Sequence, residues 1–523
     1  MISFLQQIGY AGWALHFLIW FPVVGMLATL VGSEAGAKKT ALLVAVIEFI
    51  VSIPLWPAFN PASAAFQLAT SIPWIRPWGI SYSVGIDGIS LFLVLLTTFI
   101  TPLTVLGSFR YIQKREKTFY AMMLLLETGV VGVFCALDLF LFFMFWEVML
   151  VPMYFIIGVW GGERRIYAAI KFFLYTTFGS LLMLVAILYL YFRYHALTGN
   201  LSFAYQDLLQ VPLTFRQQFW LFTAFALAFL IKVPVFPFHT WLPDAHVEAP
   251  TPGSVILAAV LLKMGGYGFL RFLLPFFPQA ATNEVVVGVL MTLGLMGIIY
   301  TAWVAAVQPD AKKLIAYTSV AHMGFVVLGI FALTVQGVQG AMIVMLSHGV
   351  STGAMFLLLG MLYERRHTRL ISEFGGLSAV MPMFATIFVI TALASIGLPG
   401  LSGFVGEFLV LVGTFQTHPV VALIATTGVI FAAYYMLPMV QRIWFNSLDN
   451  EKNRGLRDLS GRELAVLVPL VVIMVWMGVY PKPFLERMEV TVTGLLQTVE
   501  QKRTPPPMFG LAPMPDAGRA SGR

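Results

Sequence analysis

The chain has few charged residues. Of its 523 residues only 11% are Asp, Glu, Lys or Arg, whereas 59% are hydrophobic. Because soluble domains carry about 25% charged residues, this composition excludes an ordinary soluble protein and indicates an integral membrane protein. The net charge of +7 does not indicate nucleic-acid binding, because the basic residues are spread over short loops, where they orient membrane spans. We therefore expect the lipid bilayer, and no nucleic acid, as a partner.

Cysteine is almost absent. The single Cys135 lies in an apolar run, which excludes a disulfide framework and a cysteine-ligated iron–sulfur cluster carried by this chain alone. No Gly-rich dinucleotide-binding or phosphate-binding loop precedes a helix in a soluble segment. We expect no redox cofactor and no nucleotide on the chain itself. A cleavable signal peptide is not expected either, because no basic residue precedes the first long apolar stretch.

Long apolar runs make up most of the chain. Roughly 20 apolar residues cross a bilayer as a helix, so the sequence predicts about fourteen membrane spans and an all-α polytopic fold. The spans are expected near 11–33, 39–57, 88–108, 119–137, 138–158, 169–192, 219–240, 254–274, 285–307, 313–333, 337–361, 380–414, 419–441 and 464–480. The junction at Asp138 is the least distinct, because the apolar run there is almost continuous.

Basic residues concentrate in alternate loops between these spans. The loops that carry them contain Lys38, Lys39, Arg110, Lys114, Arg115, Lys117, Arg164, Arg165, Lys312, Lys313, Arg365, Arg366 and Arg369, and the loop 442–463 on the same side adds more. The positive-inside rule places these loops in the cytoplasm and both termini on the outer side of the membrane. The Pro- and Trp-rich segment 58–87 is then expected to lie over the outer face.

One span is interrupted in its apolar centre. The run AFALAFLIKVPVF contains Lys232, which is followed by Pro234 and Pro237. A lysine near the middle of a bilayer costs roughly 2.5–3.5 kcal/mol on insertion scales. Proline removes a backbone donor and breaks or kinks the helix, and broken backbone at membrane depth persists only where protein or water covers it. A charge beside a broken helix indicates an ion path.

A second interrupted span, Ala394–Phe408, contains Pro399 and is the counterpart of the first. Interrupted helices at matching positions of two halves are typical of transporters built from repeats. We therefore predict two five-span units, 119–274 and 285–441. They are preceded by helices and an outer loop in 1–118 and followed by a cytoplasmic loop and a last helix in 442–500. Residues 501–523 have the composition of a disordered tail.

The predicted spans contain a small set of ionisable residues: Glu48, Glu127, Glu147, Lys232, Lys263, His322, His348 and Glu407. Such groups normally face the bundle interior, pair with one another and mark proton or ion routes. Glu147 has no other charge within a helical turn, so its partner must come from another helix, and Lys232 is the natural candidate. We predict that the route is formed by Glu147, Lys232, Lys263, His322, His348 and Glu407.

Simpler interpretations remain open at this stage. A buried Glu–Lys pair can be a static packing element, a histidine can be an ordinary hydrogen-bonded core residue, and Lys263 can extend to the membrane surface. Glu48 and Glu127 are either lateral coupling groups or protonated packing residues. A metal site is not expected, because the set with suitable ligand types lacks helical i, i+4 pairing: His239, Asp244, His246 and Glu248.

Four long motifs resemble a known family. They are VGIDGISLFLVLLT at 84–97, FWEVMLVPMYFIIGVWGG at 145–162, HTWLPDAHVEAPTPGS at 239–254 and LIAYTSVAHMGF at 314–325. These motifs resemble the antiporter-like membrane subunits of respiratory NADH:quinone oxidoreductase (complex I), and most closely the M-type. The M-type is favoured by Glu407, where the L-type and N-type subunits are expected to carry lysine, and by the short chain after residue 480.

The resemblance implies a fold of fourteen helices with two inverted five-helix repeats. It implies that Glu147 pairs with Lys232, that Lys263 connects the half-channels, and that Glu407 is the acidic residue of the second broken helix. Our hypothesis is that breaking the pair sends a proton to Lys263 and then through His322 and His348 toward Glu407.

The resemblance also implies partners and a location. NADH, FMN, iron–sulfur clusters and quinone would belong to partner subunits, among them L-type and N-type antiporter-like subunits. The chain would lie in a bacterial inner membrane with both termini on the periplasmic side. The alternative is a subunit of a multisubunit sodium/proton antiporter or of a membrane-bound hydrogenase, and a third possibility is a structural subunit with inert ion pairs.

Overall fold

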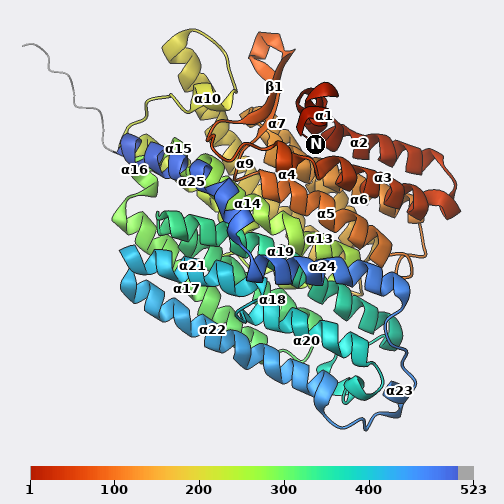
Figure 1. Cartoon of the computed structure of the whole chain (residues 1–523). Helices are drawn as coiled ribbons and strands as arrows, with labels where there is room; N and C mark the ends of the chain where they lie inside the picture. Colours follow the sequence, from red (N-terminus) through yellow and green to blue (C-terminus); the bar gives the residue numbers. More distant parts are fainter. Residues whose placement is uncertain (1, 504–523) are drawn as a thin grey trace, which may run out of the picture.

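A computed structural model describes residues 2–503 as a helical bundle (Figure 1). Within these residues, eleven helical stretches are long and apolar enough to cross a membrane: α2 (Tyr10–Val31), η1 to α4 (Glu34–Ala58), α6 (Glu116–Cys135), α7–α8 (Leu139–Trp160), α9 (Arg165–Thr198), α13–α15 (Thr251–Phe276), α17 (Glu284–Ala306), α18 (Ala311–Phe331), α19 (Val335–Arg366), α22 with η7 (Pro419–Phe445) and α24 (Gly461–Val479). The predicted class, an all-α multi-pass membrane protein, is confirmed.

The predicted count of fourteen spans is not confirmed by length and apolarity. The three further predicted spans correspond to shorter helices: α5 (Leu91–Gly107), α11 (Phe215–Lys232), and α20 (Pro382–Ile396) with α21 (Ser402–Thr417). The last two lie at the predicted interruptions. The break leaves α20 and α21 too short for a full span, whereas α11 has 18 residues but is less apolar because it includes Arg216, Gln217, Gln218 and Lys232.

The first interruption follows Lys232, the last residue of α11. The chain is helical again in α12 (Trp241–Glu248), and Pro234 and Pro237 both lie in the gap. Trp241 partly satisfies the broken end, because its indole Nε1 donates to the carbonyl of Ile231 over 2.9 Å. The predicted break is confirmed, and it places Lys232 at a helix terminus inside the protein.

The second interruption separates α20 from α21. Gly397 and Gly400 adopt φ values of +85° and +90°, which residues other than glycine rarely adopt. A Cβ at position 397 would also lie 3.0 Å from Oε2 of Glu407. Glycine at this turn therefore allows the chain to pass close to the carboxylate of Glu407.

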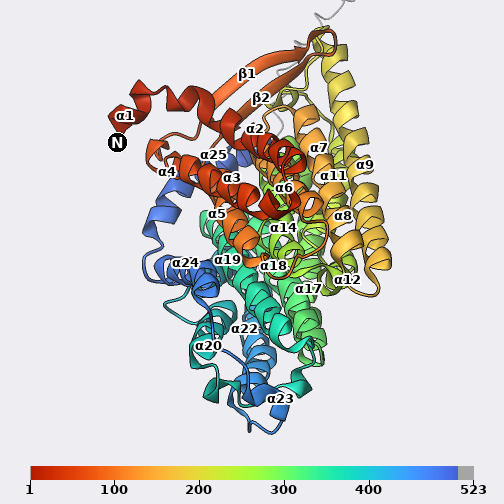
Figure 2. The ribbon, with the colours of Figure 1, turned by 90° about the vertical axis from the view of Figure 1, so that its right-hand side faces the viewer.

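The early helices α2 and α3 (Ala37–Ser52) lie at one side of the bundle and the later helices α20 and α22 at the other (Figures 1 and 2). In contrast, α24 and α25 (Lys482–Arg503) pack back against earlier elements, α24 on α5 and α25 on α15 and α16 (Pro278–Ala281). The α13–α15 stretch, α18 and α19 lie between the two sides and are almost entirely buried. Peripheral helices instead expose large apolar side chains, among them Val24, Leu174, Val289, Leu423 and Val472. These outer surfaces suit contact with lipid.

Two elements were not predicted. Segment 58–87 contains an antiparallel hairpin of β1 (Gln67–Ile75) and β2 (Ile80–Ile86), and α25 (Lys482–Arg503) follows the last span. The predicted tail is wrong at its start, because residues 501–503 belong to α25. The rest of the predicted tail lies outside the described residues. α25 is amphipathic and buries Phe484, Met488 and Val492, so a search for uniformly apolar runs does not find it.

The junction between α6 and α7 falls where it was expected. α6 ends at Cys135, and the Asp138 carboxylate accepts hydrogen bonds from the backbone N–H groups of Phe140 and Leu141 at the start of α7. It also accepts one from the N–H of Ser81 in β2. Burial raises the pKa of Asp138 to about 6, although these hydrogen bonds act in the opposite direction.

Candidate functional site

Lys263 lies on the buried α13–α15 stretch, between two π-helical turns. These turns are η3 (Leu257–Leu261) and η4 (Phe269–Leu273), which flank α14 (Leu262–Gly268). A π-helical turn disturbs the regular backbone ladder and occurs often at functional sites. The Nζ of Lys263 donates to the carbonyl of Ala258 in η3, and it lies 2.6 Å from Nδ1 of His348. Lys263 is fully buried, so it does not extend to the membrane surface.

His348 connects Lys263 to two further ionisable residues. Its ring on α19 lies 5.6 Å from the ring of His322 on α18, measured between centroids. Nδ1 of His322 lies 3.0 Å from Oε1 of Glu407 on α21. All four residues are at most 7% exposed. Lys263, His348, His322 and Glu407 therefore form one buried line that joins the first half of the chain to the second.

The structure places His348 next to Lys263 and His322 next to Glu407, because α19 packs directly on the Lys263 helix. A Cβ at Gly349 would lie 2.8 Å from the carbonyl of Ala259. The spatial order is set by which helix lies between the others, and the order of residues along the chain does not determine it.

A small cavity of about 10 Å³ lies beside the histidines and Glu407. Hydroxyl-bearing residues Ser347, Ser351 and Ser395 complete its lining. Within the described chain, Nε2 of His322 and Nε2 of His348 have no hydrogen-bond partner. A volume near 10 Å³ is roughly that needed for one water molecule. A water in this cavity would give the two imidazoles a common hydrogen-bonding neighbour, so a proton could pass between them.

Lys232 and Glu147 are neighbours but do not form a contact pair. In the part of the chain that the structure describes, no carboxylate oxygen lies within 4.0 Å of the Lys232 Nζ. This atom instead lies 3.6 Å from Sδ of Met149 and 5.2 Å from the centroid of the Trp146 ring. Glu147, on α7 (Leu139–Val148), is half-buried and within electrostatic range of Lys232. The structure therefore holds the predicted pair in an open arrangement.

The end of α11 is in backbone contact with the Lys263 helix. A Cβ at Gly265 would lie 2.6 Å from Cγ2 of Val233 and 2.9 Å from the carbonyl oxygen of Phe229. Both of these residues flank Lys232. Glycine at position 265 thus lets the two lysine-bearing helices approach closely, and it links the pair at Glu147 to the buried line.

Sequence reasoning missed His246 as a member of this site. The residue is fully buried on α12, its ring stacks 4.6 Å from that of Phe356, and neither ring nitrogen has a hydrogen-bond partner within the described residues. It lies within electrostatic range of both Lys263 and Lys312. Lys312 lines a cavity of about 240 Å³ together with Glu248 and other residues of the basic loops. His246 does not line this cavity, but Val247 and Glu248, which follow it on α12, do.

The four possible metal ligands, His246 among them, do not converge. Asp244 bonds to Nζ of Lys171 over 2.7 Å, and Glu248 accepts from the backbone N–H of Arg164 over 2.9 Å. His239 packs against the ring of Phe236. Asp244 and Glu248 thus have polar partners elsewhere, whereas Nδ1 of His239 and both ring nitrogens of His246 have none among the described residues. The signal available in the sequence was a histidine in the segment directly before the apolar run that carries Lys263.

Glu48 on α3 (Ala37–Ser52) and Glu127 on α6 lie against each other in the interior. Their exposures are 0% and 3%, and none of their carboxyl oxygens has a hydrogen-bond partner among the described residues. Neither residue contacts the line from Lys263 to Glu407 through any hydrogen bond among the described residues.

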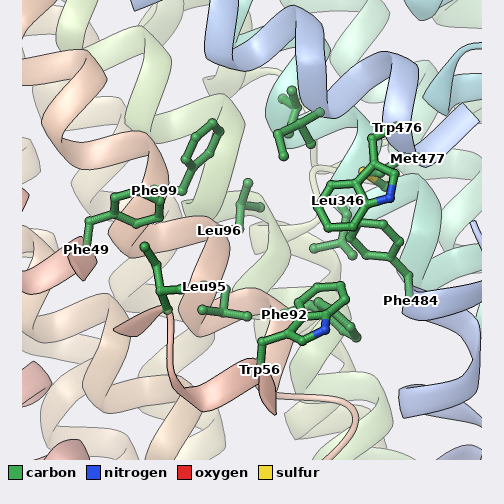
Figure 3. Close-up of a pocket in the computed structure, with 13 residues that line it drawn as sticks. Phe49, Trp56, Phe92, Leu95, Leu96, Phe99, Leu346, Trp476, Met477 and Phe484 are labelled. Carbon is green, nitrogen blue, oxygen red and sulfur yellow. The ribbon is translucent and has the colours of Figure 1, made fainter. Parts of the chain in front are cut away.

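An apolar cavity of about 300 Å³ lies on another side of the bundle, between α3, α5, α19, α24 and α25 (Figure 3). Its walls are aromatic and aliphatic side chains that include Trp56, Phe92, Phe99, Trp476 and Phe484. No titratable carboxylate, lysine or histidine lines it. This cavity therefore takes no part in a proton path.

Two family models and a relative of high identity match the chain. The family model described as "NADH:quinone oxidoreductase/Mrp antiporter, TM" matches residues 136–432, and "NADH-ubiquinone oxidoreductase chain 4, amino terminus" matches 19–131. NADH-quinone oxidoreductase subunit M of Rhodobacter capsulatus is 48% identical over 89% of this chain and 91% of that relative.

Solved structures share the fold. A chain of respiratory complex I from Thermus thermophilus has a TM-score of 0.85 and 33% identity, over 93% of this chain and 99% of that one. A chain of the Mrp complex from Dietzia sp. DQ12-45-1b has a TM-score of 0.78 and 20% identity, over 93% of this chain and 55% of that one. The second likeness is one of fold alone.

Proposed function

Because this chain belongs to the M-type (chain 4) family of antiporter-like subunits of NADH:quinone oxidoreductase, we propose that its buried lysines, histidines and Glu407 carry protons across the membrane arm of that enzyme. The observation that supports this most directly is the contact line from Lys263 through His348 and His322 to Glu407. Each member can hold or release a proton, and each lies beside the next.

Redox chemistry in partner subunits starts proton transfer along the line by changing the interaction between Glu147 and Lys232. Two unit charges 4 Å apart interact by about 4 kcal/mol at an effective dielectric of 20. Moving Glu147 toward or away from Lys232 therefore changes strongly how tightly the lysine holds its proton. In the open arrangement Lys232 passes its proton to Lys263 across the close helix contact at Gly265, and the closed pair then takes up another.

Protons reach the line from the side of the basic loops. The cavity at Lys312 is lined by Val247 and Glu248, which follow His246 on α12. The ring nitrogens of His246 have no hydrogen-bond partner among the described residues and are suited to relay a proton toward Lys263. The basic loops make this side cytoplasmic, and both termini then lie on the periplasmic side of a bacterial inner membrane. NADH, FMN, iron–sulfur clusters and quinone are bound by partner subunits, and L-type and N-type subunits are the membrane-arm neighbours.

Sodium is the alternative coupling ion, because the Mrp complex shares the fold. The chemistry of the line favours protons. Three of its four members are lysine or histidine, which are poor ligands for a hard cation that requires oxygen donors. Only Glu407 offers a carboxylate.

Replacing His348 or His322 with glutamine distinguishes proton transport from sodium transport along this line. Glutamine keeps a hydrogen-bonding group of similar size and adds a carbonyl oxygen, but it does not titrate. We expect each variant to lower NADH-driven proton uptake into vesicles by at least about tenfold, a typical effect of losing a positioned proton-transfer group. The measurement is made in sodium-free buffer with a pH-sensitive dye.

The control is His195→Gln on the exposed end of α9. It is expected to pump as the parent does. Normal proton uptake in His348→Gln and His322→Gln, or ion uptake that requires sodium, would contradict proton transfer along this line.

A further inference from the structure

A buried ion pair lies at the end of the Lys263 helix that is opposite the basic loops. Nη2 of Arg271 is 2.6 Å from Oδ1 of Asp87, and the two side chains are only 5% and 2% exposed. Arg271 follows Lys263 by two helical turns on one continuous helical stretch, which is roughly 12 Å at 1.5 Å per residue. No step of the proposed function uses this pair.

Aromatic groups surround the Arg271 guanidinium. Its Nε donates to the hydroxyl of Tyr267 over 3.1 Å, and that hydroxyl donates to the carbonyl of Phe134 over 3.2 Å. The rings of Phe66 and Tyr267 lie 4.8 Å and 5.3 Å from its Cζ. Tyr267 comes one turn after Lys263 and one turn before Arg271, so the three side chains lie on one face of the helix.

On its other side the pair borders a cavity of about 470 Å³. Asp87 and Arg271 line this cavity together with polar residues of α25, and the exposed Gln497 and Gln501 lie at its rim. α25 is held over it, because the backbone N–H of Gly88 donates to Oγ1 of Thr491 over 3.1 Å. The ion pair therefore lines the surface cavity and lies on the same buried helical stretch as Lys263, two turns away.

We propose that the Asp87–Arg271 pair seals the Lys263 end of the proton path against this surface cavity. The inference rests on the proposed function, because a proton path open to both sides at once would leak. Arginine stays protonated at any physiological pH, and a fixed cation in a narrow passage repels an incoming proton. Asp87 holds the guanidinium in place, and the rings around it exclude water. Asp87 and Arg271 are positioning residues that keep Lys263 accessible from one direction only.

The test is the double variant Asp87→Asn/Arg271→Gln in the assembled complex in vesicles. Asparagine keeps an acceptor for the backbone N–H groups of Ile89 and Ser90, and glutamine keeps a donor for the Tyr267 hydroxyl. Both charges are removed together, so neither remains buried alone. We expect NADH-driven quinone reduction to persist, whereas an imposed pH gradient should collapse several-fold faster in vesicles without NADH.

The matched control neutralises another ion pair, Arg365–Glu463, at 2.7 Å, in which Glu463 is buried and Arg365 is half-buried. The double variant Arg365→Gln/Glu463→Gln is expected to leave the idle vesicles as tight as the parent, and Arg271→Lys, which keeps the charge, should also stay tight. If the Asp87→Asn/Arg271→Gln complex pumps normally and its vesicles hold the pH gradient as long as the parent's, the proposal of a seal is wrong. Should that variant fail to assemble, Tyr267→Phe decides, because loss of its hydroxyl is expected to raise the leak at least twofold and an unchanged leak overturns the proposal.

The proposed seal and the proposed proton path are tested by different measurements. The leak in idle vesicles measures the seal without any pumping. NADH-driven uptake in the histidine variants measures the path. Defective pumping in those variants beside an unchanged leak in Asp87→Asn/Arg271→Gln would remove the seal and leave the proposed function standing.

Discussion

Replacement of Lys263 with alanine is expected to lower NADH-driven quinone reduction and proton uptake together, each by at least about tenfold. Lys263 is the first member of the buried line, and its Nζ touches His348 directly. Alanine removes the titratable group that contacts that histidine. Because pumping and electron transfer are coupled in the enzyme, blocking one slows the other. Both rates are measured in the same vesicle preparation.

A lysine on the surface supplies the control for this prediction. Lys482 on α25 is exposed and its ion pair with Glu486 is a surface one. Such pairs contribute little, so Lys482→Ala is expected to behave as the parent. Pumping at the parental rate in an assembled Lys263→Ala complex would contradict a path through this residue.

Replacement of Lys232 with methionine is expected to have an effect of similar size, a loss of at least about tenfold in both activities. The Lys232 side chain lies among Met149, Trp146 and Phe172, which is an environment that suits methionine as well as lysine. Lys232→Met therefore preserves packing and removes only the charge that responds to Glu147. A switch requires that charge, and we expect the complex to assemble and fail to pump.

The same variant distinguishes a switch from a static packing element. If Lys232 only fills space at the end of α11, methionine should restore nearly full activity, and Lys232→Ala should be the worse of the two because it leaves a cavity. Equal loss in both variants supports the switch. Parental activity in Lys232→Met would reject it.

The interruptions of the helices could be predicted from the sequence, because proline and glycine act locally. Pro234 cannot continue α11, and the Gly397 turn requires a positive φ, so both breaks follow from single residues. The ionisable residues could also be identified, because a charge in an apolar run is costly wherever it packs. These features depend on the chain close to the residue itself.

Features that depend on packing between helices could not be predicted. The order of His348 and His322 depends on α19 lying against Ala259, and the open arrangement of Glu147 and Lys232 depends on the position of Met149. Neither is encoded in residue spacing. His246 was overlooked because its neighbours in sequence resemble metal ligands, whereas its neighbours in space are Phe356 and the two buried lysines.

Secondary structure outside the spans was missed for a different reason. α25 has apolar residues on one face and polar residues on the other, so its mean hydropathy is too low for a membrane span. Its importance appears only in space, where it covers the cavity beside Arg271. The count of spans was likewise affected by the two broken helices, whose segments are short although each belongs to one crossing of the bundle.

The most direct test of a proton path through the buried line is to replace Lys263 with arginine and to measure quinone reduction and proton uptake side by side. Arginine keeps the positive charge and the length of the side chain, but it does not release its proton. If Lys263 transfers protons, Lys263→Arg should assemble and lose both activities as completely as Lys263→Ala. If Lys263→Arg reduces quinone and pumps at the parental rate, the residue supplies only charge or packing, and protons do not pass through it.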